Sequence, residues 1–371
     1  MKKQILILTF FMAALLVGNN AFGQLSDGSP DLDYLDAVPT YCTPALPIDC
    51  GNGTDALAPL PGVSYPYTIT SSSVGTLHWF VTDDASIISA QGTIAAGIEL
   101  ADGSSPYVLT ADAAYNDPAN TSATVNITWK SFDGLANNVI LVVYNVDDVN
   151  CTDNMEVFRI IPQYNFTLDI ASIADDGVNG GDVAAVEDCV NPIQSASYDG
   201  TARMLTVDYG TDYVFFAVNA ANWQTSWMPD NFTATTNGTS TVTVTGWAYP
   251  ADAATTGTWN TVGTDPVLAT GYASAVNGFV AEGCIIVRVQ VDHGSTTENL
   301  TAETINLTVN GEMINAQTTS YDGTYPDLED GGGVACPNDL TSDNADYVIT
   351  PRPDVDESTP TPFEDKTPNG D

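Results

Sequence analysis

Short runs in which apolar and polar residues alternate dominate the chain between residues 65 and 310. In "TVNITWK", Val125, Ile127 and Trp129 alternate with polar side chains, and "CIIVRVQVD" repeats this pattern from Ile285 onward. Period-two runs rich in β-branched and aromatic residues are typical of strands with one face in a core. Clusters of Asp, Gly and Asn such as "TDD" and "YDG" separate the runs and predict turns. The sequence therefore predicts an all-β protein.

The strand patterns fall into two blocks, which predict two tandem β-sandwiches of Ig-like style. The first covers residues 61–163, where "LHWFV" places Trp79 toward the core and "NVILVVYNV" reads as a strand covered on both faces. Trp129 points inward in the same way. The second block covers residues 164–324, from "NFTLDIASI" to "ETINLTVNGEM". Residues 24–60, rich in Pro and Asp, predict an extended lead-in to the first sandwich.

The composition changes after residue 324. Residues 325–371 contain few apolar side chains, several prolines and many acidic groups, which predicts a mostly disordered acidic tail. Within this tail "DYVITP", residues 346–351, alternates like a strand. We expect this island to be able to add to the edge of a sheet.

The N-terminus predicts export. "MKK" supplies a basic start, "ILILTFFMAALLVG" is an apolar run too short for a bilayer span, and Ala21 and Gly23 fit a cleavage site. Residues 1–23 therefore read as a signal peptide, and the mature chain is expected to be secreted, at the cell surface or in the periplasm. No later stretch predicts insertion into a membrane.

The charge of the chain limits its partners. The formal net charge is −39, and it becomes −41 when Lys2 and Lys3 leave with the signal peptide. Such a chain repels phosphate backbones and anionic membrane surfaces, which excludes nucleic acid as a partner. The partners that remain are other surface or extracellular proteins, a second copy of the chain, or a glycan.

An even number of cysteines in an exported chain predicts disulfides. Pairing Cys50 with Cys151 and Cys189 with Cys284 ties the ends of each block, but Cys42 and Cys50 are equally close in sequence. The pairing therefore stays open among the six candidates: Cys42, Cys50, Cys151, Cys189, Cys284 and Cys336.

A set of core and turn positions within residues 60–162 follows a known pattern: Tyr65, Tyr67, Ile69, Trp79, Val81, Ile88 to Thr93, Val125, Ile127, Trp129, Asn150 and Cys151. In these positions the segment resembles the PKD-like, Ig-like β-sandwich domains of exported Bacteroidetes surface proteins. The chain departs from the pattern by a long insertion, "IAAGIELADGSSPYVLTADAAYNDPANTSA". The resemblance implies an extracellular, non-catalytic module of adhesive or scaffold proteins, and it transfers no active site.

The segment "NAANWQTSWMPDNF" predicts a ligand site, because it is loop-like and contains Trp223, Trp227 and Met228. Exposed aromatic rings stack on sugars, and exposed apolar patches mark interfaces. The competing interpretation is a loop that folds back onto its own domain.

Acidic, Gly- and Asn-rich loops predict calcium as the one candidate cofactor, because calcium prefers carboxylate and carbonyl oxygens. The competing interpretation is solvated turns, since neither loop has the spacing of a dedicated calcium motif. The candidate ligands are Asp147, Asp148, Asp153, Asp175, Asp176 and Asp182.

No catalytic residues are predicted. Neither His78 nor His293 lies near a nucleophile motif in the sequence, and no G-x-S-x-G is present. We therefore expect a non-catalytic secreted or cell-surface structural or adhesive protein. The alternatives are a glycan-binding surface protein and a subunit of an extracellular filament that assembles by strand addition.

Overall fold

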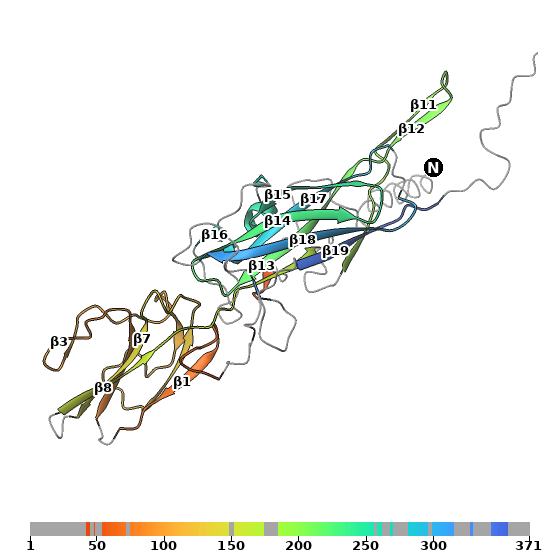
Figure 1. Ribbon diagram of the computed structural model, residues 1–371. Coiled ribbons are helices and arrows are strands. Elements are labelled where there is room, and N and C mark those ends of the chain that lie inside the picture. The colour runs from red at the N-terminus through yellow and green to blue at the C-terminus, as the bar shows by residue number, and fades with distance from the viewer. Residues whose placement is uncertain are drawn as a thin grey trace, which may run out of the picture.

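The computed structural model describes residues 42–44, 48, 54–71, 75–147, 152–173, 185–255, 258–261, 268–269, 281–295, 299–314, 327–328 and 343–354. These residues are nearly all β, which confirms the predicted class. Among them the only helices are α2 (Pro250–Thr255) and the 3-10 turn η2 (Ala281–Gly283). The predicted signal peptide and most of the predicted lead-in lie outside the described residues. Figure 1 shows an elongated molecule, with β1 to β8 at one end and the later strands at the other.

The N-terminal region contains two three-stranded sheets with antiparallel pairing. The first has the order β1-β6-β5 and the second β2-β7-β8. The strands are β1 (Ser64–Thr68), β2 (Thr76–Thr82), β5 (Val108–Ala111), β6 (Thr124–Trp129), β7 (Ile140–Asp147) and β8 (Thr152–Arg159). The sequence patterns predicted strands at the positions of the others, but β5 lies within the segment described above as an insertion and was not predicted. A two-stranded ribbon, β3 (Ile88–Ala90) and β4 (Thr93–Ile94), connects β2 to the later strands.

The two N-terminal sheets enclose one core. Trp79 from β2 and Trp129 from β6 are both 0% exposed and share this core with Tyr67, as predicted for the two tryptophans. The indole N–H of Trp129 donates to the Tyr67 hydroxyl at 2.8 Å. Burial is the main reason that the pKa of Tyr67 is raised above its usual value. The alternation of β2 and β6 thus places the large aromatic residues inside, where their polar atoms find partners.

The C-terminal region contains a four-stranded sheet of order β15-β17-β13-β9 and a five-stranded sheet of order β10-β19-β18-β14-β16. The first consists of β9 (Thr167–Ile173), β13 (Thr211–Ala221), β15 (Thr241–Ala248) and β17 (Cys284–Asp292). The second consists of β10 (Ala185–Cys189), β14 (Ser226–Thr236), β16 (Leu268–Ala269), β18 (Glu303–Ile314) and β19 (Asp343–Thr350). A separate ribbon, β11 (Ser195–Asp199) and β12 (Met204–Asp208), projects from the end of this region (Figure 1).

Alternate side chains of both C-terminal sheets form a second core. Phe216 and Val287 come from the four-stranded sheet, and Leu307 and Tyr347 come from the five-stranded one. Tyr347 lies in β19, inside the predicted acidic tail. The alternating island of the tail is therefore a strand, but it lies between β10 and β18 rather than at an edge. Its alternate residues are buried because they complete this core.

Candidate functional site

The structure buries the two tryptophans predicted to bind a ligand. Trp223 is 1% exposed and Trp227 is 0% exposed, and their ring centroids lie 6.5 Å apart in the C-terminal core. The indole N–H of Trp227 donates to the carbonyl oxygen of Glu282 at 2.8 Å. Met228 is buried as well. The prediction that this segment is an exposed loop is wrong, because β14 begins at Ser226 and its alternation turns Trp227 inward. These rings offer no face on which a sugar could stack.

The structure describes two of the six predicted calcium ligands. Asp147 ends β7 and Asp153 lies near the start of β8, so both lie at one end of the strand pair. The carboxylate of Asp153 accepts a hydrogen bond from the Tyr144 hydroxyl, and burial together with this bond raises the pKa of Tyr144 to about 12. The described part of the chain contains no group of three metal-ligating side chains. The other four, Asp148, Asp175, Asp176 and Asp182, lie outside it, and calcium binding there stays a prediction.

A disulfide joins Cys42 to Cys284, with 5.6 Å between the Cα atoms. The two considered pairings Cys189–Cys284 and Cys42–Cys50 are therefore wrong. Cys42 packs on the outer face of the four-stranded sheet, beside the first residue of β17, so it reaches Cys284 directly. Cys189 has a free and exposed thiol at the end of β10. The remaining candidates, Cys50, Cys151 and Cys336, lie outside the described residues, and the Cys50–Cys151 pairing stays a prediction.

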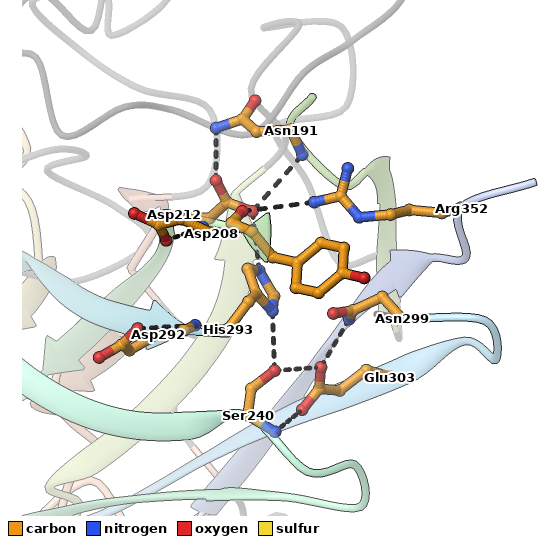
Figure 2. Close-up of polar contacts among 12 residues, drawn as sticks. Asn191, Asp208, Asp212, Ser240, Asp292, His293, Asn299, Glu303 and Arg352 are labelled. Atoms are coloured by element: carbon orange, nitrogen blue, oxygen red, sulfur yellow. Dashed lines mark hydrogen bonds and ion pairs between the residues drawn. The ribbon is translucent and has the colours of Figure 1, made fainter. Parts of the chain in front are cut away.

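A buried polar cluster occupies the end of the C-terminal region, where several strands begin or end (Figure 2). Its central residues are Asp212 in β13, Ser240 before β15, His293 after β17 and Glu303 in β18. They are between 0% and 8% exposed. Because β13 and β15 both pair antiparallel with β17, their first residues lie beside its last ones. The fold thereby brings Asp212 and His293, which are 81 positions apart, into direct contact.

Hydrogen bonds link these four side chains in series (Figure 2). The Oγ of Ser240 lies 2.8 Å from His293 Nδ1, and His293 Nε2 lies 2.9 Å from Asp212 Oδ2. The Ser240 hydroxyl donates to Glu303 Oε2 at 2.7 Å. Since a hydroxyl has one proton, Ser240 must accept from His293. The His293 ring thereby connects the Ser240–Glu303 pair to Asp212.

This cluster contains the residue types of a serine hydrolase triad, but its hydrogen bonds run in the opposite direction. In a catalytic triad the imidazole accepts the serine proton. Here that proton is directed to Glu303, and His293 faces Ser240 with a nitrogen that donates. Glu303 also accepts bonds from the Thr236 hydroxyl at 2.7 Å and the Asn299 amide at 2.8 Å. The hydrogen bonds of the cluster tie the ends of β13, β17 and β18 to the residue before β15.

The same cluster holds the root of the β11–β12 ribbon (Figure 2). Just before the ribbon, the side-chain amide of Asn191 donates to Asp212. Just after it, the Arg352 guanidinium lies 5.3 Å from the centroid of the Tyr209 ring. Gly210 follows with a φ of +84°, a backbone conformation in which a residue with a side chain would be strained. The ribbon therefore starts from a fixed base made by several strand ends.

Beyond this base, the ribbon has an apolar face in solvent. The register pairs Tyr198 with Leu205 and Ala196 with Val207, so these four side chains share one face. Tyr198 is 56% exposed and Leu205 is 58% exposed. The opposite face carries Ser, Thr and Asp side chains together with Met204. Within the described residues no sheet or helix covers the apolar face, which has the alternation of a half-buried strand pair.

A second exposed feature lies at the opposite end of the molecule, where β8 forms the outer edge of its sheet (Figure 1). It pairs with β7 over its whole length without a bulge, and seven of its eight residues are exposed. A pocket of about 600 Å³ opens beside β8 and is lined by Ile69, Ser71, Asn145 and Phe158, among others. A long, regular edge strand of this kind offers unpaired backbone groups to another strand.

Sequence reasoning missed both the polar cluster and the ribbon. The cluster gave no local signal, because its members are dispersed over the sequence, although His293 is one of only two histidines. The ribbon did give a signal. "SASYDGTARMLTV" alternates on both sides of a turn, and its register places Tyr198 beside Leu205. What the sequence could not reveal is that no other layer among the described residues covers that face.

The described residues include no helix that is both long and apolar enough to cross a membrane. No protein-family model matches the sequence, and no curated protein matches it. Among solved structures, the chain is similar to the crystal structure of Rst D1-D2, with a TM-score of 0.21 and 9% sequence identity. The alignment covers 83% of this chain and 97% of that one. A similarity this weak says nothing about fold or function.

Proposed function

We propose that the protein is an exported, non-catalytic structural or adhesive protein that acts through protein–protein contacts. The observation that carries this proposal is the exposed apolar face of the β11–β12 ribbon, with Tyr198 and Leu205 at its centre. A two-stranded ribbon is at best marginally stable alone, and a rimmed apolar patch is typical of an interaction site. A partner that covers this face would supply the missing layer.

Three further features support this proposal. The Cys42–Cys284 disulfide fits a protein of an oxidising compartment, as the predicted signal peptide does. The large negative charge disfavours nucleic acid and anionic membranes as partners and leaves proteins as the best match. The two separate cores fit tandem Ig-like sandwiches, the first of them PKD-like, a class of module associated with adhesion and scaffolding.

The test is chemical cross-linking of intact producing cells, followed by immunoblotting for this protein. The double variant Tyr198→Ser/Leu205→Ser removes the apolar face, and Ser197→Ala/Thr206→Ala on the opposite face is the matched control. We expect the first variant to lose high-mass adducts several-fold and the control to keep them. Equal adducts from wild type and both variants would refute a role of the ribbon in contacts, provided that all three proteins melt at the same temperature.

A further inference from the structure

We propose that the outer face of the four-stranded sheet binds a glycan through a sugar that carries a carboxylate, and that Arg288 pairs with this carboxylate. Arg288 lies in β17, a central strand of the sheet. Its neighbours Val287 and Val289 face the core, so Arg288 points to the opposite, outer face. The inference goes beyond the proposed function and does not rest on it, because this face is separate from the β11–β12 ribbon.

Two aromatic rings and one hydroxyl hold the guanidinium of Arg288 in place. Its central carbon lies 4.6 Å from the centroid of the Trp259 ring and 5.0 Å from that of the Tyr213 ring. Its Nε donates to the Thr245 hydroxyl at 3.0 Å. These contacts stabilise the cation and fix the plane of its fork. The terminal nitrogens Nη1 and Nη2 have no hydrogen-bond partner among the residues that the structure describes.

Arg288 lacks a counter-ion although the chain is strongly acidic. The sequence contains 47 acidic and 8 basic residues, yet no carboxylate in the described part of the chain forms an ion pair with this guanidinium. Burial lowers the pKa of Arg288, because the side chain has lost part of its hydration. A half-buried charge without a counter-ion is unfavourable. A carboxylate that accepts hydrogen bonds from both terminal nitrogens would compensate it.

The side chains next to Arg288 on this face are neutral and can form hydrogen bonds with sugar hydroxyls. The register places Gln290, the next outward residue of β17, between Tyr213 and Thr243 on the two neighbouring strands. The side-chain polar groups of these three residues form no hydrogen bonds within the described residues. An aromatic surface beside a few fixed polar groups is the usual lining of a small-ligand site. Here the Trp259 ring adds to that surface.

The charge of the whole chain determines which carboxylate ligand fits. A net charge of −39 repels polyanions, and the site offers a single cation. The ligand that fits is therefore neutral over most of its surface and has one carboxylate. An oligosaccharide that ends in one acidic sugar meets both conditions, and its hydroxyls match the neutral side chains beside Arg288.

The test compares methyl β-glucuronide with methyl β-glucoside, which differ only in having a carboxylate or a hydroxymethyl group at C6. Saturation-transfer NMR with the full exported protein measures the dissociation constant of each sugar. We expect the glucuronide to bind at least ten-fold more tightly, because only its carboxylate pairs with the guanidinium. Arg288→Gln should reduce this preference to less than two-fold. Arg159→Gln, at the end of β8, is the matched control and should keep it.

A second variant keeps the test valid if Arg288→Gln does not fold. Thr243→Ala/Gln290→Ala changes two side chains at the surface, so its melting temperature should equal that of the wild type. We expect it to bind both sugars several-fold more weakly. Unchanged binding in this folded variant would show that the sugar lies elsewhere and would overturn the inference.

The remaining outcomes also decide the question. The inference fails if the wild type binds neither sugar, if it binds both equally, or if the preference persists in folded Arg288→Gln. A neutral peptide with one aspartate is the third probe. Binding of this peptide without binding of the glucuronide would assign the site to a protein carboxylate and overturn the glycan. Tyr198→Ser/Leu205→Ser should leave sugar binding unchanged, so failure here and failure of the proposed function are distinguishable.

Discussion

The molecule contains two two-stranded ribbons, and they differ in whether their apolar side chains are packed or exposed to solvent. The β3–β4 ribbon packs Ile88 and Ile94 against an outer cluster that includes Phe80, Val142 and Tyr144. The β11–β12 ribbon holds Tyr198 and Leu205 in solvent instead. Both are short antiparallel pairs with a tight turn, so local structure does not explain the difference.

What distinguishes the ribbons is the surface beneath them. β3–β4 folds onto the outer face of β2 and β7, so Phe80 and Val142 of that face are 0% exposed. β11–β12 projects away from its region and is held at its root by the Asp212–His293 pair and its neighbours. A ribbon that covers its own domain contributes to stability, whereas the apolar face of β11–β12 covers no other sheet among the described residues.

The largest effect is expected when the polar cluster at the root of the β11–β12 ribbon loses a central residue. His293→Ala removes the imidazole that hydrogen-bonds both Asp212 and Ser240, so these buried polar groups lose a partner. We expect a loss of about 3 kcal/mol in the free energy of unfolding of the C-terminal region. Urea titration followed by tryptophan fluorescence measures it. A loss below about 1 kcal/mol would show that the cluster is not the anchor. His78→Ala, at the chain's other histidine, serves as the comparison variant.

The second prediction compares the two ribbons directly. Ile88→Ser/Ile94→Ser removes half-buried apolar area from β3–β4 and should cost about 2 kcal/mol. Tyr198→Ser/Leu205→Ser, measured where the protein is monomeric, should change stability by less than about 0.5 kcal/mol. Thermal unfolding by calorimetry gives both values. Similar losses from the two double variants would mean that the projecting ribbon is covered within its own chain.

A smaller effect is expected where the projecting ribbon joins its base. Gly210→Ala places a side chain at a φ of +84°, with its Cβ 3.3 Å from Gln194, so we expect a loss of about 1 kcal/mol. At Gly200, in the turn at the tip, a Cβ would meet no atom within 4 Å, and the backbone has no left-handed φ. Gly200→Ala is therefore the matched control and should be nearly neutral. Chemical denaturation that ranks the two variants in the opposite order would contradict the rigid base.

The smallest effect is a loss of stability at alkaline pH in the N-terminal region, which contains the β3–β4 ribbon. Burial raises the pKa of Tyr67 and of Tyr115 above the usual 10.0. Their neutral forms therefore stabilise the fold fully below pH 10, and this contribution is lost as the pH rises from 10 toward the raised values. Urea unfolding between pH 8 and pH 11 should show declining stability of the N-terminal region, with a shallower decline in Tyr115→Phe. An equal slope in both proteins would remove Tyr115 as a cause.

The strands were predictable from sequence because each has its own local pattern. "TVNITWK" and "CIIVRVQVD" became β6 and β17 with the expected faces inward, and Trp79 and Trp129 are core residues as predicted. The position of β19 was not predictable, since its alternation indicates a strand but not which neighbours it has. Its place beside β18 depends on contacts formed across a connection of more than two dozen residues.

The candidate sites were harder to predict because exposure is a property of the whole fold. Trp223 and Trp227 looked exposed in sequence, yet the two C-terminal sheets close over them. Tyr198 and Leu205 have the pattern of buried strand residues, yet nothing described covers them. Local pattern thus gives the face on which a side chain lies, and only the packing of distant strands decides whether that face meets protein or water.

The Cys42–Cys284 disulfide has a mechanical consequence when the chain is pulled from its ends. It joins two positions 242 residues apart, so the whole N-terminal region lies within a closed covalent loop. Tension that enters before residue 42 passes directly into β17 and reaches the C-terminal strands without stretching that loop. The disulfide thereby prevents roughly 800 Å of chain from being stretched out under tension. Reduction of this single bond would convert a short, stiff connector into a long, extensible one.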